Sequence, residues 1–130
     1  MNKEIVSTPN APAAIGPYSQ AIVAGPFLFC SGQLGLDPAT GDFAAGDVEA
    51  QAARSLMNLG NVLEAAGCTF DDVIVENVYT TNMPAFLKAS AYRSTIYKKQ
   101  FPTGTWLEVK GLALPEFMIE IELEAHKANP

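Results

Sequence analysis

The sequence has few charged residues, few basic ones and almost none of the side chains that build metal sites. Only 17% of the 130 residues are charged, and 14 acidic against 8 basic residues give a formal net charge of −6 at pH 7. This charge repels phosphate backbones and anionic lipids, so we expect neither nucleic acid nor a membrane as a partner. Two cysteines and one histidine offer no plausible zinc ligand set, and we expect no metal and no other cofactor.

Long apolar segments are also missing. The first residues lack the apolar core of a signal peptide, and the longest apolar run, residues 21–30, is interrupted by Gly25-Pro26. The sequence therefore predicts a soluble, cytoplasmic protein. Cys30 and Cys68 lie far apart in the chain, and we expect both to be buried apolar residues in a reducing compartment.

Apolar side chains are abundant, at 48% of a chain that has the length of one domain. We therefore predict a single domain, residues 1–130. Because a small domain has little interior, part of this apolar surface is expected to lie in a subunit interface.

Hydrophobic periodicity outlines the secondary structure. From Val48 to Ala66 apolar residues recur at steps of three and four, after a predicted N-cap at Asp47 and before a stop at Gly67. In chain order we predict strands at 5–7, 18–24 and 27–31, a helix at 48–66, a strand at 73–80, a helix at 82–100, and strands at 105–109 and 117–125.

This order of elements predicts an α+β fold: a single two-layer domain whose mixed β-sheet has two helices on one face. The other face would then be uncovered by the chain's own helices. We expect an assembly of several copies to bury this face.

Four segments carry a recognisable set of motifs: residues 11–21, 31–33, 37–41 and 49–56. In order and spacing they resemble the Rid family, also called the YjgF or endoribonuclease L-PSP family. The resemblance implies a chorismate-mutase-like fold and homotrimers with clefts between subunits. It also implies hydrolysis of reactive 2-imino acids and their enamine tautomers to ammonia and a 2-keto acid.

By the same resemblance, an arginine on the penultimate strand holds the substrate carboxylate, and a glutamate on the last strand lies near the attacking water. Glu120 matches the glutamate, but Gly104 stands in the arginine's position. Such a charge-assisted pair contributes about 1.5 to 3 kcal/mol, so ordinary 2-imino acid deamination is expected to be absent or slow. Arg93 or a lysine of a neighbouring subunit is a possible substitute.

The last strand leaves the choice of glutamate open. Glu120, Glu122 and Glu124 alternate with aliphatic residues and share one strand face, which for the latter two indicates a solvated surface. A register slip of two residues would transfer the catalytic role from Glu120 to Glu122.

Further residues are expected to bind the ligand. Tyr18 would offer its ring and hydroxyl, Ser31 and Gly32 the end of a strand, and Ser90 stands where relatives commonly have an asparagine. Trp106, in the position of a small residue, would reshape the cleft toward a flatter, more apolar ligand; filling a subunit interface explains it equally well.

Two functions of different classes fit these residues. One is a hydrolase of small imines or enamines in inter-subunit clefts, and the alternative is a non-enzymatic trimer that binds a small metabolite or a partner protein. An endoribonuclease or translation inhibitor fits less well, because the chain is acidic and has no paired histidines.

Overall fold

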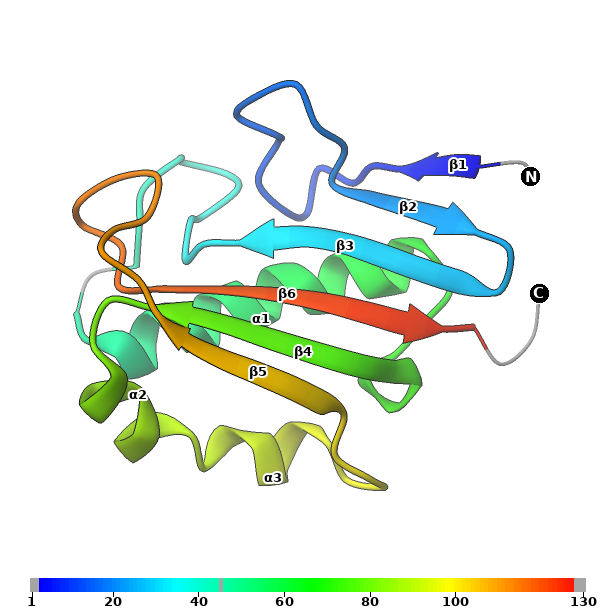
Figure 1. Ribbon diagram of the computed structural model, residues 1–130. Helices are drawn as coiled ribbons and strands as arrows, with labels where there is room; N and C mark the ends of the chain where they lie inside the picture. The colour runs from blue at the N-terminus through cyan, green and yellow to red at the C-terminus, as the bar shows by residue number, and fades with distance from the viewer. Residues whose placement is uncertain (1–2, 45, 128–130) are drawn as a thin grey trace.

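The computed structural model describes residues 3–44 and 46–127, so the predicted domain extent includes a few positions outside the described residues. Six strands form one sheet in the order β1-β2-β3-β6-β4-β5, in which only β4 and β5 pair in parallel (Figure 1). The strands are β1 Lys3–Val6, β2 Ala21–Ala24, β3 Phe27–Gln33, β4 Val73–Thr80, β5 Thr103–Glu108 and β6 Ile119–His126. The helices are α1 Val48–Ala65, the 3-10 helix η1 Phe70–Asp72, α2 Met83–Ala89 and α3 Tyr92–Ile96.

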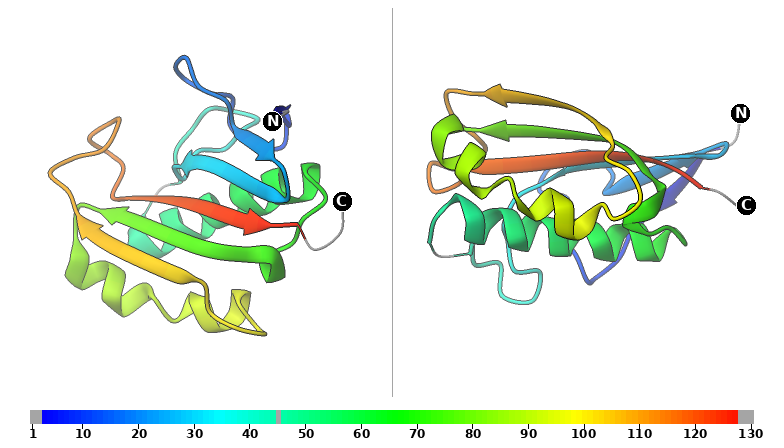
Figure 2. Two further views of the ribbon diagram at one scale, coloured as in Figure 1. Left: turned by 45° about the vertical axis from the view of Figure 1, so that its right-hand side comes forward. Right: turned by 90° about the horizontal axis from the view of Figure 1, so that it is seen from below.

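All α-helices lie on one side of the sheet (Figure 2). This confirms the predicted α+β, two-layer architecture with a mixed sheet. In the described chain, no helix combines the length and the apolar character that crossing a membrane requires.

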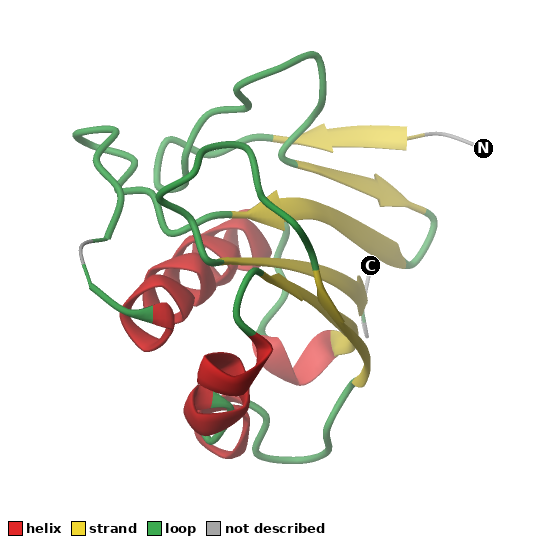
Figure 3. Ribbon diagram, turned by 60° about the vertical axis from the view of Figure 1, so that its left-hand side comes forward, coloured by secondary structure: helices red, strands yellow, loops and turns green. Residues whose placement is uncertain are grey.

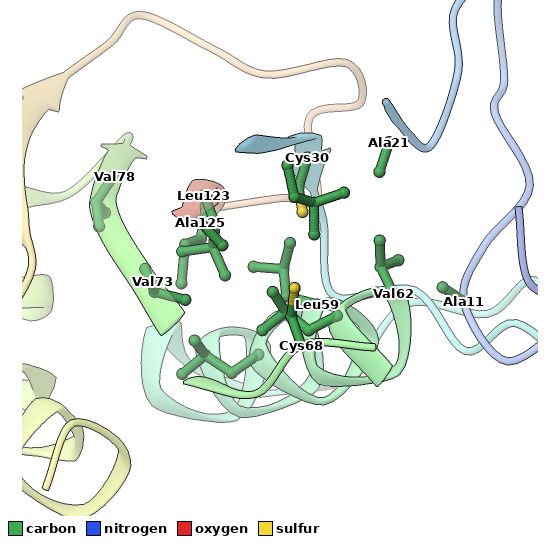
Figure 4. Packing of buried hydrophobic residues seen from close by; sticks show 14 of the residues in the cluster. Ala11, Ala21, Cys30, Leu59, Val62, Cys68, Val73, Val78, Leu123 and Ala125 are labelled. Carbon is green, nitrogen blue, oxygen red and sulfur yellow. The ribbon is translucent and has the colours of Figure 1, made fainter. Parts of the chain in front are cut away.

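Helix α1 begins and ends where the sequence predicts. The Asp47 side chain accepts a hydrogen bond from the Ala50 N–H at 3.0 Å, and Gly67 follows the helix with a φ of 78°. The apolar face of α1 packs against β3 and β6, and Leu59 and Leu63 are fully buried there. Cys30 and Cys68 lie in the same core, as expected (Figure 4).

The second predicted helix is two shorter helices, α2 and α3. Helix α2 is capped at its N-terminus by Asn82, which accepts from the Ala85 N–H. Its C-cap is Ser90, whose hydroxyl donates to the Leu87 carbonyl at 2.8 Å. Arg93 lies in α3, and its side chain reaches Glu76 of β4.

Along β6 the predicted alternation holds: Ile119, Ile121 and Leu123 are fully buried, whereas the intervening glutamates are half-buried on the open face. The pairing of β3 with β6 changes register between Cys30 and Gln33. This irregularity brings residues 31 and 32 beside the first glutamates of β6.

Leu59→Ala should lower the free energy of unfolding by about 2 to 5 kcal/mol, because it leaves a cavity between α1 and the sheet. Met57→Ala is the matched control, since Met57 lies on the same helix but is 56% exposed. Urea unfolding of both variants checks this. Equal losses would contradict the packing described for α1.

Candidate functional site

A pocket of about 420 Å³ opens beside β6. Its lining comes from β3, from β6 and from three loops. These loops lie at the same end of the sheet (Figure 3). Four predicted site residues line it together: Tyr18, Ser31, Gly32 and Glu120. The structure thus brings together residues that are about a hundred positions apart in sequence.

One buried glutamine holds the proline-rich loop that forms a wall of this pocket. Gln20 accepts from the Thr8 N–H at 2.7 Å and donates to the Pro12 and Ala11 carbonyls at 2.7 and 3.2 Å. Ser31 fastens the other side of the loop, because its hydroxyl donates to the Ser19 carbonyl at 2.6 Å. The Ser31 side chain therefore has a structural partner in addition to its place at the pocket.

Polar side chains on the buried face of α1 hold a second wall. Ser55 donates to the Gln33 carbonyl at 2.6 Å, and Asn58 donates to the Leu36 carbonyl at 2.8 Å. Gln51 donates to the Glu116 carbonyl and accepts from the Met118 N–H. Sequence reasoning missed these three residues, although their steps of four and three place them on the apolar face.

The carboxylate of Glu120 lies directly over Gly32. A Cβ at residue 32 would come within 2.5 Å of Glu120 Oε2, so only glycine leaves room for the carboxylate in this position. Burial, and then the charge of Glu122, raise the pKa of Glu120 above its ordinary value. Such a carboxyl group can accept a hydrogen bond from water and exchange a proton at a pH closer to neutral.

Glu122 also lines the pocket, but two side chains of β4 bind it. Tyr79 donates its hydroxyl proton to Glu122 Oε1 at 2.5 Å, and Asn77 Nδ2 donates to the same oxygen at 3.3 Å. The hydrogen bond to Glu122 is the main cause that raises the pKa of Tyr79 to about 12. The Glu122 carboxylate is therefore held by two hydrogen bonds from β4. The Glu120 carboxylate lies next to Gly32 instead.

The other predicted site residues lie elsewhere. Val78 pairs with both Ile121 and Trp106, so Trp106 points to the helix side of the sheet, opposite to Glu120. Its ring meets Phe86 of α2 edge-on at 4.9 Å between centroids. Gly104 is on the same side of β5, and Ser90 ends α2. None of these three lines the pocket around Glu120.

The Cys30 thiol is buried in the core and does not line the pocket. Burial raises the pKa of Cys30 to about 12, so this thiol stays protonated at neutral pH. Within the described ranges, no three histidine, cysteine, aspartate or glutamate side chains converge on a point where a metal ion could bind.

The fold and the pocket define a small α+β protein with a raised-pKa carboxyl group on the open face of its sheet. The family model described as Endoribonuclease L-PSP matches residues 8–127. A RutC family protein of Pyrococcus horikoshii is 42% identical over 96% of this chain and 98% of its own length.

A human protein and a bacterial crystal structure are also similar to this chain over most of its length. Human 2-iminobutanoate/2-iminopropanoate deaminase is 37% identical over 95% of this chain and 88% of its own length. The crystal structure of the YjgF gene product of E. coli is 36% identical, covers 95% of this chain and 98% of its own, and has a TM-score of 0.87. The chain belongs to the Rid family, the endoribonuclease L-PSP family of the matching model, as its sequence motifs predicted.

Glu122→Gln should lower the pKa of Glu120, because it removes the neighbouring negative charge that disfavours ionisation. A carboxyl-carbon NMR titration measures this pKa directly. Glu124→Gln is the matched control: it removes the same charge from the same strand face, two residues farther away. An unchanged Glu120 titration in the first variant would disprove the coupling.

Gly104→Ala should destabilise the protein by about 1 to 3 kcal/mol, because the new Cβ would come within 2.8 Å of the Glu76 carbonyl oxygen and push β5 from β4. Gly111→Ala is the control, since its Cβ would meet no atom within 4 Å. Urea unfolding distinguishes them. A Gly104→Ala protein as stable as the control would show that the strands adjust without cost.

Proposed function

We propose that this protein hydrolyses small reactive imines or enamines in clefts between the subunits of a homotrimer. The observation that carries the proposal is the Glu120 carboxyl group, with its raised pKa, in a pocket shared with Tyr18, Ser31 and Gly32. The deaminases among the relatives support the same reaction class.

The reaction requires little from the protein. A water molecule attacks the C=N carbon while the nitrogen gains a proton, and the resulting aminoalcohol releases ammonia and leaves a carbonyl compound. In this proposal Glu120 holds the attacking water and takes its proton. Tyr18, Ser31 and Gly32 form the walls that orient the substrate over that water.

The distribution of the candidate residues supports a cleft between copies. Glu120 faces the open side of the sheet, whereas Gly104 and Trp106 face the helices at the β5 edge. One copy cannot present both groups to one small ligand. A second copy that places its β5 edge beside the pocket would complete the site and would also cover apolar side chains such as Phe29 and Leu107, which are 44% and 47% exposed.

Gly104 supplies no cation, so we expect slower turnover of 2-imino acids than in relatives with an arginine there. A non-enzymatic trimer that binds a metabolite or a partner is the alternative, and Trp106 in place of a small residue favours it. Endoribonuclease activity, named in the family description, is a weaker candidate because the chain carries a net charge of −6.

The direct test generates 2-imino acids with an amino-acid oxidase and follows ammonia release over the rate in buffer. We expect acceleration, and Glu120→Gln should reduce it by about a hundredfold, because the general base is lost. Glu124→Gln should leave it unchanged. A well-folded protein that does not accelerate release of ammonia would favour the binding function instead.

A further inference from the structure

A buried ion pair lies on the helix side of the sheet, outside the pocket. Arg93 of α3 reaches β4, where its Nη1 donates to Glu76 Oε1 at 2.5 Å. The side chain of Glu76 is fully buried and that of Arg93 is 12% exposed. Removing two charges from water is costly, and a pair at this depth calls for an explanation beyond packing.

The surroundings hold the guanidinium in one orientation. Tyr92 and Tyr97 donate their hydroxyl protons to Glu76 at 3.0 and 2.7 Å, so the carboxylate is bonded through both oxygens. The rings of Trp106 and Phe101 flank the guanidinium, with its carbon at 5.3 and 5.9 Å from their centroids. The guanidinium is thus fixed between the buried Glu76 and the exposed ring of Phe101.

The Arg93 guanidinium lies beside Gly104 of β5. A Cβ at residue 104 would lie 3.7 Å from Arg93 Nη1, so a side chain leaving β5 here would meet the Arg93 guanidinium. By the resemblance described above, relatives have an arginine at 104. In this chain the strand position is a glycine, and the arginine beside it comes from the helix, at 93.

We propose that Arg93 of a neighbouring copy binds the carboxylate of the substrate that lies over Glu120, in place of the arginine that is missing at 104, and that Glu76 orients it. The inference rests on the proposed function and extends it to substrates that carry a carboxylate. Of the five N–H donors of the guanidinium, one binds Glu76 and another makes a long contact of 3.4 Å with the Pro102 carbonyl. The remaining donors are the ones that would bind the ligand.

Glu76 weakens this binding without abolishing it. Coulomb energy falls as the inverse of distance, so a carboxylate across the guanidinium from Glu76, about twice as far from Glu76 as from Arg93, loses roughly half of the attraction. We therefore expect Arg93, paired with Glu76, to bind a carboxylate weakly and in a charge-dependent way. Turnover of 2-imino acids would then be slow but not absent.

The test compares two ligands that differ in one charge. Trp106 is the only tryptophan of the chain and flanks Arg93, so its fluorescence reports binding. The ligands are 2-oxobutanoate, the keto acid that hydrolysis of 2-iminobutanoate yields, and its uncharged methyl ester. The readout is the ratio of the two dissociation constants, measured for wild type, Glu76→Gln and the double variant Glu76→Gln/Arg93→Met, with circular dichroism to verify folding.

In Glu76→Gln the opposing charge is gone, and we expect the preference for the acid over the ester to rise about tenfold. In the double variant no buried charge is left unpaired, and the preference should fall below that of the wild type by about tenfold or more. A merely structural Arg93 would leave the ratio the same in all three proteins, which would overturn this inference but not the proposed function. If the folded wild type binds neither ligand, this inference is overturned as well, whereas the proposed function is decided by the ammonia-release assay.

Discussion

The alternation of side chains along β6, the central strand on which both halves of the sheet pair, determines the core and the pocket at once. Ile119 and Ile121 point to the helices and are fully buried, whereas Glu120 and Glu122 point to the open face. A shift of one residue would bury the carboxylates under α1 and expose the aliphatics. The hydrophobic core therefore fixes the face of the sheet on which the Glu120 carboxyl group lies.

Buried polar side chains then hold the loops that surround Glu120. Gln20 holds the proline-rich loop, and Gln51, Ser55 and Asn58 hold the chain around the ends of β3 and β6. Each binds backbone groups of these segments, and leaving such groups unpaired in the interior would cost about 1 to 3 kcal/mol. These hydrogen bonds tie the loops that form the walls of the pocket to a helix and to a buried glutamine.

The sequence was sufficient for the architecture, because strong periodicity and clear caps define α1, β4 and β6. It was less informative about the site. Gln51, Ser55 and Asn58 are polar and resemble solvated residues until the strand ends beneath them are known. The break between α2 and α3 was missed for a related reason. Arg93 lies on the buried side of α3 because it forms an ion pair with Glu76, which is seventeen positions earlier in the sequence. Pairings between distant residues of this kind have no local signature.

Two glycines lie next to charged side chains of other elements, and both bear on function. Gly32 leaves room for the Glu120 carboxylate, and Gly104 leaves room beside the Arg93 guanidinium; in each case a charged side chain from another element lies beside the missing Cβ. Sequence reasoning treats a glycine in place of a functional residue as a loss. Here the space it leaves is next to a group of the required charge, held by a carboxylate and flanked by aromatic rings. The meaning of a glycine at a site thus depends on which side chain occupies the space above it.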